Sequence, residues 1–203
     1  MKEIRAFSFE IRAGESEGKH TLTGRPIVFG SKTDLGWYDE IIKAGALDLT
    51  DLKDVRFLVN HNTDMIPLAR SRNNNESSTM QMTVVPEGMD IRVDLDTENN
   101  AESKSLYSAV SRGDISGMSF MFTVDADSWD DMESDHPTRT ITKIGKVFEV
   151  SAVTFPAYEA TSIQARGLSD ALESAKTSLE SARAEAREIE RRKQKIRILT
   201  EVI

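Results

Sequence analysis

The stretch RGDISGMSFMFTV, residues 112–124, marks the point where a helical pattern gives way to a strand. From Met118 to Val124, every second residue is apolar. This alternation predicts a β-strand with one apolar face. Ser119 falls on the opposite face, where an ordinary serine would be a small polar residue on a half-exposed strand.

The segments around this strand predict a compact, largely antiparallel β domain with a few helices. Alternating or continuous apolar residues predict strands at 4–11, 22–29, 52–59, 80–85, 89–95 and 147–155. Gly24 and Pro26 indicate a bulge or an edge in the second of these strands. The turn sequence PEG, residues 86–88, predicts a hairpin between its two neighbours. Residues 101–112 have helical spacing, and Gly113 stands where a helix C-terminus favours glycine.

The pattern changes near Gly167. From Leu168 to Ile189, leucine, alanine and isoleucine recur in steps of four and three, which predicts one long helix. Residues 168–203 hold eight Lys or Arg against seven Asp or Glu, whereas residues 1–166 carry a net charge of −9. We therefore expect a domain of residues 1–166 and a coiled-coil or scaffold-like helix of residues 167–203. This helix can pack on the β domain or pair with a partner helix, and the length of its pattern favours the partner.

Composition restricts the chemistry of the chain. It has 203 residues, a net charge of −8 and no cysteine. The lack of cysteine excludes thiol catalysis, disulfides and thiolate metal sites. The negative charge argues against nucleic acid as a partner, and no apolar run is long enough to span a membrane. We expect a soluble intracellular protein that binds neither.

The sequence predicts no metal and no cofactor. The three histidines, His20, His61 and His136, are too far apart for a local metal motif. No glycine-rich phosphate-binding loop is present. The acidic segment DADSWDDMESDH, residues 125–136, predicts a solvated loop, and it lacks the regular ligand spacing of a calcium site.

A histidine, a serine and a glutamate remain as candidates. His61 follows an apolar strand and begins a polar loop, a common position for a catalytic base. Glu149 lies within an otherwise apolar strand, where a carboxylate needs a partner. With Ser119, these groups could form a nucleophile, a base and an orienting acid. Their spacing does not decide between acyl-transfer catalysis and ordinary structural roles.

Four strings decide this question by resemblance. VRFLVNHNTDMIPLARS (55–71), SRGDISGMSFMFTV (111–124), FEVSAVTFPAYEATS (148–162) and WYDEIIKAGAL (37–47) resemble the prohead proteases of tailed bacteriophages. These are serine peptidases with a fold akin to the herpesvirus assembly protease, and the resemblance covers residues 1–166. It agrees with the pattern of strands in predicting a mainly antiparallel, β-barrel-like core with a few helices. With the long C-terminal helix predicted from the periodicity, we expect an α+β fold.

The resemblance also implies roles for individual residues. It places the nucleophile on Ser119, the base on His61 and the third, acidic member on Glu149, with Ser116 as the second choice of nucleophile. Met121 is a departure, since the family usually has glycine or alanine two residues after the serine.

The function implied is maturation of the phage prohead. The protein is expected to act inside the immature capsid in the bacterial cytoplasm, cleaving scaffold segments, the major capsid protein and itself. It is also expected to form a homo-oligomer. The C-terminal helix would then be a targeting arm or a self-cleaved propeptide. The alternatives are a non-enzymatic capsid assembly factor with a coiled-coil arm and a small-molecule hydrolase.

Overall fold

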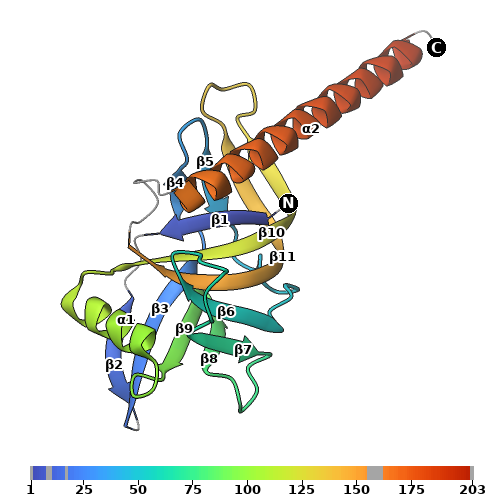
Figure 1. Ribbon diagram of the computed structural model, residues 1–203. Coiled ribbons are helices and arrows are strands. Elements are labelled where there is room, and N and C mark those ends of the chain that lie inside the picture. Colours follow the sequence, from blue (N-terminus) through green and yellow to red (C-terminus); the bar gives the residue numbers. More distant parts are fainter. Residues whose placement is uncertain (1, 8–10, 17, 155–161, 202–203) are drawn as a thin grey trace.

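In the part of the chain described by the computed structural model, two β-sheets and two helices form (Figure 1). The structure describes the backbone of residues 2–7, 11–16, 18–154 and 162–201. It also describes the side chains of these residues except 6, 7, 162–170 and 198–201. Parts of two predicted strands, residues 8–10 and Phe155, lie outside the described residues.

The larger sheet contains the predicted strand that carries Ser119. Its members are β1 (Lys2–Phe7), β4 (Lys32–Asp34), β5 (Asp39–Ile42), β6 (Asp54–Val59), β7 (Ala69–Arg72), β10 (Gly117–Asp130) and β11 (Thr138–Val153). β10 pairs antiparallel with β1 on one side and with β11 on the other. β11 is long enough to pair with two further strands, β5 near its start and β6 near its end, both parallel.

The smaller sheet is antiparallel throughout its described residues, in the order β2-β3-β9-β8. Its strands are β2 (Arg12–Ser16), β3 (Lys19–Val28), β8 (Met80–Val85) and β9 (Gly88–Leu95). The predicted hairpin of β8 and β9 is confirmed. The pairing of β3 with β9 shifts register between Gly24 and Ile27, where the sequence predicts a bulge.

The α+β class and the mainly antiparallel pairing are confirmed. The two sheets are separate, however, and neither closes into a barrel. The larger sheet branches at β11, since this strand exchanges one partner for another along its length. One apolar core contains residues from both sheets, including Leu22, Phe57, Met89 and Phe120, all fully buried.

Helix α1 spans Ala101–Arg112, as predicted. The side chain of Asn100 accepts hydrogen bonds from the backbone N–H groups of Glu102 and Ser103 at its N-terminus. At the other end Gly113 adopts the left-handed conformation with φ of 80°, which glycine adopts without steric cost. Leu106 and Val110 bury the inner face of the helix.

The acidic segment 125–136 differs from the predicted loop. β10 continues to Asp130, whose register partner on β11 is Thr138, so residues 125–130 belong to a strand of a long hairpin. Trp129 explains the difference, because its indole is buried in a second apolar cluster with Tyr38. In the sequence, one tryptophan among carboxylates is only a weak indication of a strand, although burial of Trp129 accompanies the extension of β10.

Helix α2 spans Ser162–Glu201 and extends beyond the sheets (Figure 1). It begins before the predicted start at Leu168. Ala175 and Leu179 pack against Tyr38 and Trp129, whereas the side chains of residues 184–197 are exposed. The helix therefore packs on the β domain through residues such as Ala175 and Leu179, and pairing of its exposed part with a partner helix stays a prediction. No helix in the described part of the chain is both long and apolar enough to cross a membrane.

Candidate active site

His61 stands at the end of β6 in an unusual backbone conformation. Asn60 and His61 both have positive φ angles, 51° and 57°, a region that costs energy for residues other than glycine. The carboxamide of Asn60 holds this turn by bonding to Thr154 twice, donating to its hydroxyl and accepting from its backbone N–H, each at 2.9 Å. The turn directs the imidazole into the protein, where the residue is only 2% exposed.

The hydroxyl of Ser119 lies directly beside this ring. The distance between Ser119 Oγ and His61 Nε2 is 2.6 Å. Ser119 is fully buried and is therefore not the half-exposed strand residue that an ordinary serine would be at this position. In the register of the larger sheet, Ser119 lies opposite Ala6 of β1 and Ser151 of β11.

Glu149 contacts the other nitrogen of the ring. Its Oε1 is hydrogen-bonded to His61 Nδ1, and the glutamate is 3% exposed. Its Oε2 accepts a hydrogen bond of 2.5 Å from the hydroxyl of Ser151. An imidazole whose Nδ1–H donates to a carboxylate presents Nε2 as an acceptor, the form required of a base.

Ser151 is a residue that sequence reasoning missed. Besides its bond to Glu149, its Oγ accepts a hydrogen bond of 3.2 Å from the backbone N–H of His61. Ser151 therefore fixes the positions of both His61 and Glu149. The available signal was its place two residues after Glu149, which puts both side chains on the same face of one strand.

Strand pairing explains how residues so distant in sequence meet. β11 lies between β10 and β6, and Ser151 is the register partner of Ser119 on one side and of Leu58 on the other. β6 then ends at Val59, and the turn that follows brings His61 across the end of β11. The sheet thus brings together all three residues expected to form the site.

The other candidates lie elsewhere. Ser116 is exposed, in the segment before β10. His20 lies on β3 of the smaller sheet, and its ring is hydrogen-bonded to the hydroxyl of Thr97. Met121 is half-buried and is the register partner of Glu149, so it adjoins the site through the sheet.

One group of side chains could in principle hold a metal ion. The ligand atoms of Asp34, Asp39 and His136 lie within 4.8 Å of one another. His136 Nε2 is 3.1 Å from Asp39, and the ammonium of Lys32 is 3.0 Å from the same carboxylate. This ammonium supplies part of the positive charge that a cation would bring. The group belongs to β4, β5 and the turn before β11, and none of the three proposed catalytic residues belongs to it.

A network of buried charges underlies β1. Arg5 bonds to Glu40 and, at 2.6 Å, to Glu3. Arg139 bonds to the same two glutamates at 3.0 and 3.2 Å. Ser174 of α2 donates to Glu3 at 2.9 Å, so the helix contacts this network as well as the apolar cluster.

The charged forms of Glu3 and Arg5 are favoured despite burial. Burial would raise the pKa of Glu3, but the two arginine charges and the hydrogen bonds from Arg139 and Ser174 outweigh it and lower this pKa. Burial likewise would lower the pKa of Arg5, yet the neighbouring carboxylate of Glu40 raises it. Tyr38 lies close by, and burial raises its pKa to about 12. Ion pairs of Glu3 and Arg5 therefore hold β1, the strand that pairs with β10 at Ser119.

Comparisons with known proteins found a matching family model and a similar solved structure. The family model of the caudovirus prohead serine protease matches residues 7–175. The solved structure of the bacteriophage T4 capsid assembly protease gp21 is similar to this chain, with 12% sequence identity and a TM-score of 0.42. That likeness covers 76% of this chain and 99% of the T4 chain. No curated protein matches the sequence.

The family match extends over most of the chain and includes all three members of the hydrogen-bonded group. Members of this family are serine proteases of phage capsid assembly. The chain belongs to the caudovirus prohead serine protease family.

Proposed function

We propose that this protein is a serine endopeptidase in which Ser119 is the nucleophile, His61 the general base and Glu149 the residue that orients the base. Its substrates are scaffold segments, the major capsid protein and the protein itself, cleaved inside the prohead. The observation that carries the proposal is the contact of 2.6 Å between Ser119 and His61, with Glu149 on the far nitrogen of the ring.

The geometry supports a two-step acyl transfer. His61 Nε2 takes the hydroxyl proton as Ser119 Oγ bonds to the scissile carbonyl carbon, and the imidazolium is stabilised by Glu149. The C–N bond then breaks, and the departing amine receives that proton from His61. A water molecule attacks the resulting ester in the same way, with His61 again as base. The acid is released and Ser119 regains its proton.

The long helix fits a role in delivery. We assign proteolysis to residues 1–166 and recruitment to residues 167–203, with the exposed residues 184–197 as the contact surface. Pairing with helices of the scaffold would raise the concentration of the protease in the growing shell. The same exposed surface would allow the protein to form a homo-oligomer.

Co-expression with the cognate capsid protein tests the catalytic assignment. Intact mass should show shortened capsid protein with the wild-type protease and with Ser116→Ala, but full-length protein with Ser119→Ala. A fluorophosphonate should add its mass to Ser119 in the wild type. A wild-type protein that neither cleaves nor takes up the probe would be an assembly factor rather than an enzyme. The mass of the protease itself would show whether it is trimmed near Gly167.

A further inference from the structure

We infer that a cavity between α1 and the loop after β6 binds an aliphatic side chain of the substrate peptide, close to the bond that is cleaved. The inference rests on the proposed function, because it concerns the substrate of the same site. The protease should prefer leucine, isoleucine, valine or methionine at one position of the peptide, and should exclude aspartate and glutamate there.

The first support is that residues lining the cavity lie close in the chain to the proposed catalytic residues, although none of these three lines it. Asn60 and Asn62, the two neighbours of His61 in the chain, both line it. So does Ile115, four residues before Ser119. Consecutive Cα atoms are about 3.8 Å apart, so these lining residues lie within a few peptide units of the base and the nucleophile. An extended substrate that reaches Ser119 therefore passes the cavity within roughly four residues of the cleaved bond.

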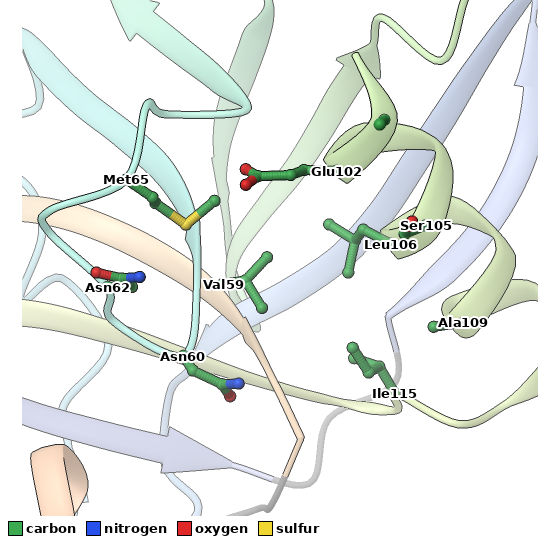
Figure 2. Close-up of a pocket in the computed structure, with 10 residues that line it drawn as sticks. Val59, Asn60, Asn62, Met65, Glu102, Ser105, Leu106, Ala109 and Ile115 are labelled. Atoms are coloured by element: carbon green, nitrogen blue, oxygen red, sulfur yellow. The ribbon is translucent and has the colours of Figure 1, made fainter.

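The second support is the chemistry of the walls. Figure 2 shows Val59 and Leu106 facing each other across the cavity, with Ile115 below them. Met65 approaches from the loop side. These side chains come from β6, the following loop, α1 and the segment before β10, so the cavity forms only in the folded chain. Apolar walls favour an apolar occupant, because an ion would lose its hydration without gaining a partner.

Charge narrows the choice further. Glu102 is the one ionisable side chain among the ten lining residues, all of which lie in the described part of the chain. Its carboxylate points toward the loop that carries Met65 (Figure 2). An acidic side chain entering the cavity would therefore meet a like charge. The acidic class is excluded on this ground, and the apolar walls select the aliphatic class from the rest.

Size is consistent with a side chain of the substrate rather than a single water molecule. The volume of the cavity is about 690 Å³, within the range of sites that bind small ligands. This space accommodates a leucine side chain together with part of the peptide backbone. Alanine would leave most of the apolar wall in contact with water, so a large aliphatic residue is expected instead.

The decisive experiment profiles cleavage of a synthetic library of acetylated peptides with randomised positions. Mass spectrometry of the products should show one position, within four residues of the cleaved bond, where aliphatic residues exceed acidic ones by about 10-fold to 200-fold. Ser105→Phe inserts a ring into the cavity from an exposed position on α1 and should abolish this preference. Lys104→Phe adds the same ring to an exposed neighbour that does not line the cavity, and should keep it.

Two outcomes of the profile would overturn the inference. One is a Ser105→Phe protein that retains the aliphatic preference. The other is a Ser105→Phe protein that cleaves every peptide more slowly by the same factor, because the substitution would then act on the catalytic step.

A second measurement separates the cavity from the chemistry. The Ser119→Ala protein is titrated with N-acetyl-leucine methylamide, or with the aspartate analogue, and the methyl resonance of Met65 is followed by NMR. The leucine compound should shift this resonance and the aspartate compound should not. A resonance that neither compound moves, or that both move equally, would overturn the inference. If the wild type cleaves no peptide while the leucine shift is present, the proposed function fails and the binding site stands.

Discussion

The hydroxyl oxygen of Ser119 lies 2.8 Å from the backbone carbonyl oxygen of Arg5, on the strand that pairs with β10. A serine hydroxyl has one proton, so it can donate either to this carbonyl or to His61, but not to both. The residue proposed as nucleophile is thus also a structural contact between β1 and His61, the proposed base.

This double contact predicts that Ser119→Ala costs stability as well as activity. The substitution removes the hydrogen-bond partner of the Arg5 carbonyl and of His61 Nε2 in a fully buried site. Cleavage should be lost, and urea denaturation should show a free energy of unfolding lower by about 1–3 kcal/mol. Ser116→Ala, at an exposed position, is the matched control and should match the wild type in both measurements. The reverse pattern would make Ser116 the nucleophile.

Glu149→Gln should reduce kcat strongly while the fold is retained. The amide has the same shape, but it carries no charge to stabilise the imidazolium and can select the wrong tautomer of His61. The expected loss is on the order of 10⁴-fold in kcat, measured with a cleaved peptide. Glu15→Gln, on the exposed surface of β2, should leave kcat unchanged. A loss below about tenfold would mean that Glu149 does not orient the base.

Ser151→Ala tests a positioning role. The hydroxyl of Ser151 accepts a hydrogen bond from the backbone N–H of His61 and donates one to the carboxylate of Glu149. Loss of this hydroxyl should make the position of His61 less well defined, while no contact with the substrate is removed. A hydrogen bond to a charged group contributes about 1.5–3 kcal/mol, which corresponds to a reduction of about 13-fold to 160-fold in kcat. KM should stay the same, because binding of the peptide is not affected. Ser128→Ala, exposed on β10, serves as control. An increase in KM with unchanged kcat would assign Ser151 to substrate binding.

The buried ionic network predicts a loss of stability in acid. The pKa of Glu3 is lowered by folding, so its contribution is complete above the ordinary value of 4.5 and is lost as pH falls through the lower folded value. Glu3→Gln leaves buried arginine charges without one partner and should cost about 3–5 kcal/mol near pH 7. The difference between wild type and variant in urea denaturation should shrink below pH 4.5. A difference that is constant with pH would show that Glu3 contributes through packing alone.

Truncation of α2 tests the proposed recruitment surface. Removing residues 184–203 deletes the exposed side chains of residues 184–197 and should leave peptide cleavage and thermal unfolding unchanged. Incorporation into proheads, measured by gel analysis of purified particles, should be lost. Leu179→Ala provides the contrast, because Leu179 is buried against Trp129 and its truncation should cost about 2–5 kcal/mol of stability. Normal incorporation of the truncated chain would refute the recruitment role.

Local signals predicted the local parts of the fold well. The bounds of α1 follow from its spacing and from Gly113, and the hairpin of β8 and β9 follows from its turn. The parallel pairing of β11 with β5 and β6 depends on contacts between distant segments, which leave no periodic trace in either strand. The start of α2 was also missed, since Gly167 suggests an end rather than an interior position of a helix.

The candidate site shows the same division. A polar residue in an apolar strand identified Glu149, because burial of a carboxylate requires a partner. The resemblance to a protease family, rather than spacing, selected Ser119 and His61. The sequence did not indicate the role of Ser151 as clearly, since a buried serine is compatible with many roles. Its importance depends on the register between β10 and β11, which only the structure provides.

The two neighbours of β10 limit how a substrate can approach. At the level of Ser119 this strand is paired on both edges, with Ala6 on one side and Ser151 on the other. A peptide therefore cannot join the sheet as an additional strand beside Ser119. In the proposed mechanism the scissile bond would reach Ser119 from the face of the sheet that carries His61, and strand order would set the direction of attack.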